Sequence, residues 1–511
     1  MNASSQNSKK IVKNTLALYF RQIITMLVML FTSRIILQTL GVTDFGISNV
    51  VGSVVAMFVV FSNTLTVITQ RFITVELGNG GNSVNLQKIF STSIILQIAI
   101  AIIVVILSQT VGLWFLNNKL NIPAERLLAA NWVYQFAVLS FLLSLLNSTF
   151  TALIVSHEDM HIYGFVGIFD AVLRLGTVYL LVIADADKLI LFGMLGFAAS
   201  CAMSLFYFVY CRKKYSDTKF SLAFDKSLFK EFGGYGKHVF ISSVFMVLNI
   251  YGIGIMLNMF FGPAINAAKG IATTVNTALS SLGNSFKQSL SPQLMKAYAQ
   301  KNCEYMWDLS ARGTRFMFFL FFVFSVPLLL ETEFLLKLWL GEVPEYTAIF
   351  ARLIIIFSLL NVLIYTMDSI NHATGKIGAY SSVGYVGSAL ELLFAYFFLK
   401  AGFAPYFAFV APILLFPICI TAQCMVMKKQ VGFSIKHFTQ KALIPIFLVS
   451  MLSFLPFYFV NKLFLQSFWQ SWIVLLTSVL WTGFVILFVG LKNDERVKIY
   501  AFVKRKVGQV L

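Results

Sequence analysis

Charged residues are scarce in this chain of 511 residues, and acidic residues are the scarcest of them. Only 12% of the residues are charged, whereas a soluble domain carries about 25%. The five cysteines have no metal-ligand spacing and are too few for a disulfide scaffold, so we interpret them as reduced thiols. No polar stretch is long enough to form a separate soluble domain, since the longest, near 211–238, is a short basic linker. An ordinary soluble enzyme is therefore excluded.

Apolar residues make up 58% of the chain, and 53 residues are Phe. A chain this apolar places most of its length in lipid. Runs of about 20 apolar residues, the length that crosses a hydrocarbon core of roughly 30 Å, occur near 15–38, 46–68, 90–113, 130–153, 162–184, 188–210, 239–261, 265–286, 315–330, 351–371, 379–400, 405–427, 442–461 and 470–490. The ninth run is short and the eighth is polar, so we expect between 12 and 14 spans.

The formal net charge is +18, and its distribution predicts a membrane topology. A cytoplasmic N-terminus places 28 of the 39 Lys and Arg on the cytoplasmic side, seven outside and four within spans. This positive-inside pattern favours fourteen spans with cytoplasmic N- and C-termini. The basic residues are spread over seven segments and not gathered on one face, so membrane lipids are the expected partners and nucleic acid is not.

A weak internal repeat relates the two halves of the chain. An offset of 221 residues aligns Gly41 with Gly262 and Asn63 with Asn284, and it brings the fourth and fifth spans onto the tenth and eleventh. Six spans per half make the two repeats parallel. We therefore predict an all-α integral membrane protein of about 14 transmembrane helices, in two parallel six-helix lobes plus two appended helices. The predicted bounds are 1–221 for the N-lobe, 222–441 for the C-lobe, and 442–511 for the appended helices and basic tail.

Polar side chains recur at helical spacing along six of the predicted spans, including the first, second, fourth and seventh. The tenth span carries Ser358, Asn361, Tyr365, Asp368 and His372, and the eighth carries Lys269, Thr273, Asn276, Ser280, Asn284 and Lys287. We expect spans one, two, four, five, seven, eight, ten and eleven to line a central aqueous cleft, with the other four of the twelve facing lipid. Alternatively, single Ser, Thr and Asn side chains serve as hydrogen-bonding groups between helices.

Seven ionisable side chains lie inside predicted spans, four of them cationic and three acidic. A cationic excess in lipid suits an anionic substrate such as a phosphate ester. The candidate substrate-binding cations are Arg21, Arg174, Lys269 and Arg352. The candidate cavity or coupling residues are Asp170, Asn284, Asn361, Tyr365, Asp368 and Glu391.

Several of these charges have a second interpretation. Asp170 and Arg174 lie four residues apart on one helical face, so they also fit a neutral structural ion pair. Arg21 and Lys269 lie near span ends, where long cationic side chains reach the interface, and Arg352 fits an interfacial anchor. Glu391 aligns with Asp170 at an offset of 221 or with Arg174 in a second alignment.

The segment from His157 to His161 matches the H-E-x-x-H pattern of zinc metalloproteases. Here these five residues form nearly the whole turn between the fourth and fifth spans, and no third ligand follows them. We therefore expect a polar hairpin and no bound metal. We also expect no enzymatic activity, because no large extramembrane domain is present to hold a nucleotide sugar.

Four short segments together resemble a known family, and the likeness extends over nearly the whole chain. They are QRFI with ELG at 70–78, LNMFFGP with NAAKGIA at 257–272, SPQ with KAYA at 291–299, and ATGKI at 373–377. The chain thereby resembles the multidrug/oligosaccharidyl-lipid/polysaccharide (MOP) exporter superfamily, specifically its polysaccharide biosynthesis, O-antigen flippase-like branch.

The resemblance implies two six-helix lobes that work by alternating access in the bacterial inner membrane. The implied substrate is an undecaprenyl-diphosphate-linked oligosaccharide, of the O-antigen or lipopolysaccharide kind, moved from the cytoplasmic to the periplasmic leaflet. A polysaccharide polymerase and glycosyltransferases are the expected protein partners. No cofactor is expected beyond a coupling Na+ or H+. The alternative function is that of a cation-coupled multidrug or metabolite antiporter of the MATE type.

Overall fold

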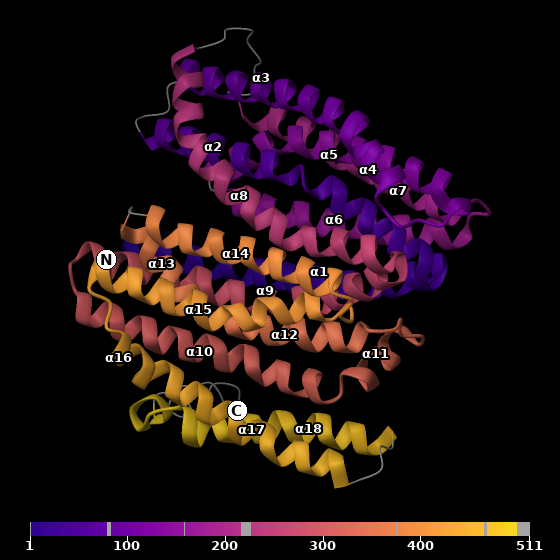
Figure 1. The fold of residues 1–511 in the computed structure, drawn as a ribbon. Coiled ribbons are helices and arrows are strands. Elements are labelled where there is room, and N and C mark those ends of the chain that lie inside the picture. Colours follow the sequence, from indigo (N-terminus) through magenta and orange to yellow (C-terminus); the bar gives the residue numbers. More distant parts are fainter. Residues whose placement is uncertain are drawn as a thin grey trace. The chain divides into compact units, whose positions relative to one another are not determined.

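The computed structural model describes residues 2–78, 83–157, 159–215, 226–374, 377–463 and 468–497. Within these ranges the chain is helical almost throughout and forms no strand, which confirms the predicted all-α class (Figure 1). Eleven of the described helices are long and apolar enough to cross a membrane, or twelve if one bent pair is a single span. The helix α9 (Pro263–Ala299) is not among the eleven, in line with the polarity of the eighth predicted span.

The chain divides into two compact units, which are described separately. Unit 1 comprises residues 1–274, 344–347 and 388–408, and unit 2 comprises 275–343, 348–387 and 409–511. The helices that begin in unit 1 are α1 (Asn2–Ala56), α2 (Val59–Gly78), α3 (Ser83–Leu107), η1 (Ser108–Gly112), α4 (Leu113–Asn118), η2 (Ala124–Arg126), α5 (Leu127–Ser156), α6 (Met160–Ile183), α7 (Lys188–Lys214), α8 (Lys226–Phe261) and α9. The predicted division into N-lobe, C-lobe and appended segment stays a prediction.

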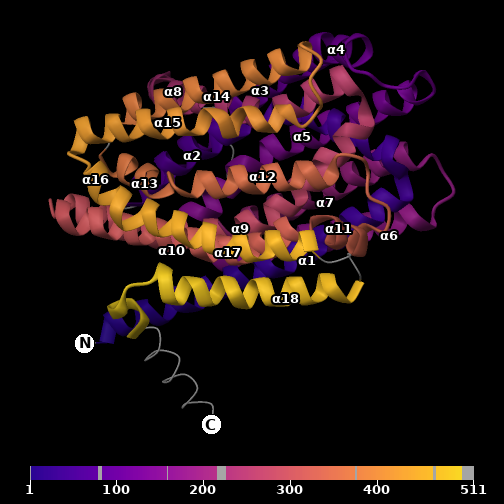
Figure 2. The same ribbon diagram turned by 60° about the horizontal axis from the view of Figure 1, so that its bottom comes forward.

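The later helices form most of unit 2. They are α10 (Cys303–Leu330), α11 (Thr332–Leu340), α12 (Thr347–Val362), α13 (Tyr365–Thr374), α14 (Ile377–Lys400), α15 (Phe407–Val431), α16 (Ile435–Phe438), η4 (Thr439–Leu443), α17 (Ile444–Leu463), α18 (Phe468–Val485) and η5 (Ile486–Gly490). The helices α9 and α14 each contribute residues to both units. The last long helices, α17 and α18, lie side by side, and both pack against α10 (Figure 2).

Two glycines that the sequence repeat aligns adopt the same unusual backbone conformation. Gly41 interrupts α1 with a φ of 74°, and Gly262 separates α8 from α9 with a φ of 83°. Both values lie in the left-handed region, which glycine enters without steric cost. The part of α1 after Gly41 contacts the start of α9, since a Cβ atom built on Gly46 would overlap the carbonyl oxygen of Pro263. The two segments that follow these glycines therefore pack closely within unit 1.

The core of unit 1 is built around α5, which packs against α2 and α7. Tyr134 on this helix is fully buried, and its hydroxyl donates a hydrogen bond of 2.9 Å to the carbonyl oxygen of Ser108 in η1. The helix α7 begins at a clear cap, because the Asp187 side chain accepts hydrogen bonds from the backbone amides of Leu189 and Ile190. Three basic residues close its last turn, where they complement the helix dipole.

The ninth span is longer than the sequence analysis predicted. The helix α10 has 28 residues and begins at Cys303, with Asn302 as its N-cap, whereas the predicted run began at Arg315. The charges of Asp308, Arg312 and Arg315 interrupt the apolar run and hid its first three turns. In the structure Arg312 pairs with Asp308 at 2.6 Å, and Arg315 is only 1% exposed inside the helix bundle of unit 2. Arg315 is thus a buried charge and not the loop cation that the charge count assumed.

Replacing Gly46 with Ala should destabilise unit 1. The added methyl group overlaps the Pro263 carbonyl group, and overpacking of this kind costs about 1–3 kcal/mol. The thermal midpoint of the purified protein in detergent measures the loss. Gly52→Ala on the same helix is the control, because a Cβ there meets no atom within 4 Å. Equal midpoints for the two variants would disprove the tight contact.

Candidate functional site

A buried carboxylate lies between α8 and α14 in unit 1. Glu391 is 8% exposed, and its Oε2 accepts a hydrogen bond of 2.6 Å from the side-chain amide of Asn249. Among the described residues no basic group lies within ion-pair distance of this carboxylate. Burying an ionised carboxylate without a positive partner is costly, so such a group takes up a proton or a cation. These contacts are compatible with a coupling role of Glu391, which stays a prediction.

The Lys269 amine contacts α8 at Ile250, the residue after Asn249. Its Nζ donates to the carbonyl oxygen of Ile250 at 3.3 Å. It occupies the space that Gly254 leaves open, because a Cβ at Gly254 would lie 2.5 Å from Nζ. The same point lies within 3.3 Å of the Ser53 hydroxyl and 3.4 Å of the Asn266 amide oxygen. The Lys269 amine thus hydrogen-bonds to α8 beside Gly254, in a region that the Ser53 hydroxyl of α1 and the Asn266 amide oxygen of its own helix α9 also border.

An ion pair of unit 1 lies on α6. The Nε of Arg174 donates to the carboxylate of Asp170 at 2.9 Å, so the predicted i,i+4 pair forms. The side chains are 69% and 37% exposed, respectively. Since only Nε makes this bond, the terminal nitrogens of the guanidinium keep donors for a further anion. The pair is compatible with both interpretations of the sequence analysis, structural and functional.

Two predicted polar stripes of unit 2 face each other. At one level the Ser358 hydroxyl of α12 donates to the side-chain oxygen of Asn276 on α9 at 2.7 Å. At another, the Lys287 Nζ of α9 lies 3.7 Å from the Asp368 carboxylate and 4.6 Å from the centre of the Tyr365 ring, both on α13. The stripes are therefore partly satisfied by each other, as expected of hydrogen-bonding groups between helices.

Asp368 is the most connected of the predicted coupling residues. Besides Lys287 it accepts a hydrogen bond of 2.9 Å from the Tyr380 hydroxyl of α14. Asn361, by contrast, donates to the Phe357 carbonyl oxygen of its own helix at 3.0 Å. The bend between α12 and α13 falls between these residues and measures 43°. Asp368 thus lies on the short helix beyond the bend, held by one cation and one hydroxyl.

Arg352 lies apart from these groups, near the junction of α10 and α11. Its Nε donates to the Thr332 hydroxyl at 3.1 Å, and a terminal nitrogen lies 3.5 Å from the Glu333 carboxylate. The side chain is 37% exposed. These contacts favour the interpretation of Arg352 as an anchor over a role in substrate binding.

Some predicted residues lie outside the described part of the chain. The side chains of Arg21, Asn284 and His161 are not described, and neither is Glu158. In the H-E-x-x-H segment the described ring of His157 stacks on Tyr215, with centroids 4.5 Å apart. Across the described residues no group of three or more His, Cys, Asp and Glu side chains is placed to hold a metal ion.

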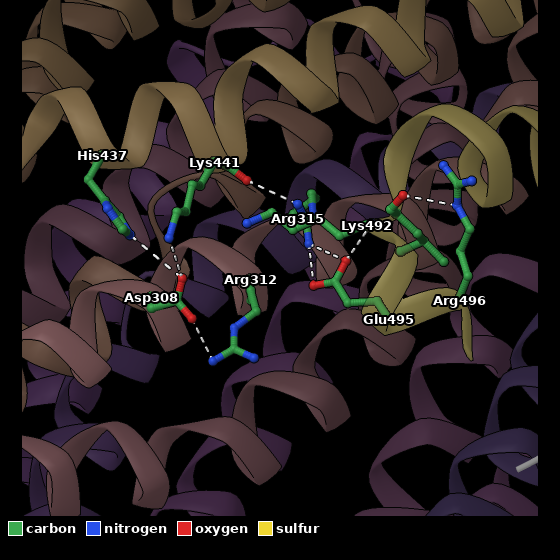
Figure 3. Close-up of polar contacts among 9 residues, drawn as sticks. Asp308, Arg312, Arg315, His437, Lys441, Lys492, Glu495 and Arg496 are labelled. Atoms are coloured by element: carbon green, nitrogen blue, oxygen red, sulfur yellow. Dashed lines mark hydrogen bonds and ion pairs between the residues drawn. The ribbon is translucent and has the colours of Figure 1, made fainter. Parts of the chain in front are cut away.

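An ionic cluster near the C-terminus, here named the terminal clamp, was not foreseen from the sequence. It consists of Asp308, Arg315, Lys441 and Glu495 (Figure 3). Arg315, on α10, is paired with Glu495 beyond α18 at 2.5 Å, and its second terminal nitrogen reaches the Lys441 carbonyl oxygen at 3.4 Å. The Lys441 amine pairs with Asp308 at 3.0 Å. The clamp thereby fastens the segment before α17 and the segment after α18 to α10.

A second unforeseen ionic group lies in unit 1 and joins three helix ends. The Arg126 guanidinium contacts Asp44 of α1 at 2.5 Å and Asp187, the cap of α7, at 2.7 Å. The hydrogen bond from Arg126 holds the pKa of the Asp187 carboxyl below its usual value. The sequence shows only three charges in separate predicted loops, so no local spacing reveals this group.

Replacing Glu495 with Gln should loosen the terminal clamp. The substitution leaves the Arg315 charge buried without a counter-charge, and breaking a buried pair in this way costs about 3–5 kcal/mol. The thermal midpoint of the detergent-purified protein and the rate of tryptic cleavage after α18 measure the effect. Asp494→Asn, at an exposed neighbouring position, is the control. If both variants behave like the unmodified protein, the clamp does not hold the C-terminal helices.

No protein-family model matches the chain, and no curated protein matches it. Solved structures do match it. The lipid II flippase MurJ in an inward closed conformation has a TM-score of 0.65 and 13% identity over 94% of this chain and 98% of that chain. An inward-facing multidrug resistance MATE family transporter of the MOP superfamily has a TM-score of 0.64 and 13% identity over 81% and 99%. A MOP superfamily transporter from Pyrococcus furiosus has 0.62 and 12% over 82% and 96%.

Identities this low establish the fold and nothing more specific. The described chain shares it with MATE transporters and with MurJ, which agrees with the superfamily that the sequence motifs resemble. Together with the apolar helices, this likeness makes the chain a multi-pass membrane protein with the fold of the MOP superfamily.

Proposed function

We propose that this protein translocates a polyprenyl-diphosphate-linked oligosaccharide across the bacterial inner membrane by alternating access. The observation that carries the proposal is the environment of Lys269. Its amine donates to the uncharged carbonyl oxygen of Ile250, and no described carboxylate lies within ion-pair distance of it. A cation kept among apolar helices without a counter-ion is costly unless a ligand supplies the negative charge. A diphosphate supplies it in a form that ammonium and guanidinium groups bind well.

Arg174 supports the same class of substrate. Its side chain is 69% exposed and uses one of its nitrogens for Asp170, so the fork of terminal donors is open to a phosphate. Lys269 and Arg174 both belong to unit 1, as do the buried Asn266 and its unpartnered amide nitrogen. That amide group offers a further donor among the described residues for a phosphate or sugar oxygen.

The extent of the structural matches also favours a lipid-linked substrate over a free solute. The MATE matches cover 81–82% of this chain, and the match to the lipid II flippase covers 94%. The difference is about one eighth of the chain, which is close to the share made up by the segment from α17 to the end. The apolar pair α17 and α18 in this segment is consistent with a path for a lipid tail.

The second candidate function is cation-coupled antiport of a drug or metabolite. The buried Glu391 favours it, because among the described residues its carboxylate is paired with the neutral Asn249 amide and with no cation, which suits it to binding a proton or Na+. The same residue also serves the main proposal as a coupling site, so the two candidates differ in substrate and not in the use of Glu391. The positive charge of Lys269 disfavours a cationic drug.

Lys269→Gln and Arg174→Gln should each reduce surface polysaccharide by at least about tenfold, because each removes a charged contact to the diphosphate. The variants are expressed in a strain that lacks the native copy, and lipid-linked oligosaccharide is measured in the same cells. We expect it to accumulate. Lys301→Gln, an exposed cation elsewhere, is the matched control. Normal polysaccharide from both variants, at normal membrane levels, would contradict the proposal.

Resistance to cationic compounds distinguishes the second candidate. Under the flippase proposal, overexpression in a drug-sensitive strain leaves the inhibitory concentration of such compounds unchanged. Antiport predicts an increase that disappears in Glu391→Gln and persists in the exposed control Glu342→Gln. An increase of this kind, with wild-type polysaccharide in the Lys269 variant, would replace the flippase proposal by the antiporter.

A further inference from the structure

A groove along one side of α7 and α6 in unit 1 takes no part in the functions above. It has a volume of about 840 Å³ and is lined by Phe169 of α6 and by residues of α7 that include Ala202, Phe206, Val209, Tyr210 and Lys213. The α7 residues follow steps of three and four, so they form one continuous stripe on the helix. The stripe is apolar along its length and basic only at its end.

We propose that this groove binds one anionic phospholipid, with an acyl chain along the apolar stripe and the phosphate at Lys213. The dimensions fit one leaflet. From Ala202 to Lys213 the stripe rises by eleven residues, or about 17 Å. Half of a hydrocarbon core of roughly 30 Å is about 15 Å. A chain that fills the stripe therefore has its headgroup at the basic end.

The walls of the groove are ordered aromatic rings. Phe206 lies 5.5 Å from Phe169 across the two helices and 6.0 Å from Tyr210 one turn further along α7, in each case between ring centroids. Next to them Leu205 is 64% exposed. Rings that hold one another in place lose little freedom when an acyl chain lies on them, and they define a hollow that a flat helix surface lacks.

The charges at the end of the stripe select the headgroup. Lys214 is already paired with Asp159 at 2.8 Å, whereas no described carboxylate lies within ion-pair distance of Lys213. Arg212 packs over the Phe208 ring at 5.6 Å and does not line the groove. One unpaired cation thus lies at the mouth of an apolar hollow, which complements a phosphate attached to an acyl chain. A zwitterionic headgroup gains less there, because its own cation competes for the phosphate.

The test is native mass spectrometry of the delipidated full-length protein in detergent, titrated with phosphatidylglycerol or with phosphatidylcholine. We expect one phosphatidylglycerol to bind more tightly than phosphatidylcholine. Lys213→Gln should weaken phosphatidylglycerol about tenfold, the loss of one charge-assisted contact. Arg212→Gln, the neighbouring cation outside the groove, should leave its binding unchanged.

A second variant tests the apolar part. Ala202→Trp fills the groove and should remove tight binding of both lipids, whereas Met194→Trp, exposed on the same helix outside the groove, should not. Equal affinities for the two lipids, or equal effects of Lys213→Gln and Arg212→Gln, would overturn the proposal. It would also be overturned by a dimer that Ala202→Trp dissociates, since a second copy would then occupy the groove. Lys213→Gln decides the question alone if Ala202→Trp does not fold.

Discussion

A charged or polar side chain among apolar helices has to find its partners inside the protein, because lipid offers none. Most of the described polar contacts follow from this constraint. Arg315 meets Glu495, Asp368 meets Lys287 and a tyrosine hydroxyl, and Glu391 meets an amide. Against this background Lys269 stands out, since its amine donates to a backbone carbonyl oxygen and no described carboxylate lies within ion-pair distance of it. The proposed function rests on that difference between satisfied and unsatisfied charge.

The fold positions these groups through a few close backbone approaches. Gly254 leaves the space in which the Lys269 amine lies, and Gly46 lets α1 approach the backbone at the start of α9. In unit 2 the terminal clamp joins α10 to the segment before α17 and to the segment after α18. Small residues at crossings and internally paired charges are the means by which helices associate in lipid, where apolar burial between helices gives no driving force.

Features with a local or periodic signal were predictable from the sequence. The all-helical fold followed from the apolar runs, the turns at Gly41 and Gly262 from the repeat, and the Asp170–Arg174 pair from its i,i+4 spacing. Contacts between distant segments were not predictable. Arg315 and Glu495 are 180 residues apart, and Asn249 and Glu391 are 142 apart, so no spacing rule connects them. The start of α10 was misplaced because its charges pair within the helix and with distant segments rather than with water.

The proposed activity is the movement of a diphosphate-linked glycan from one leaflet to the other. The measurement uses purified protein in sealed vesicles whose two leaflets both contain a polyprenyl-diphosphate-linked oligosaccharide with a label on its glycan. A glycosidase that cannot cross the membrane is then added outside. Without the protein, only the labelled glycan in the outer leaflet is cleaved. When the protein is present, we expect the cleaved fraction to rise until nearly all of the labelled glycan is cleaved. Cleavage that stays at the level of protein-free vesicles, under both Na+ and proton gradients, would contradict it.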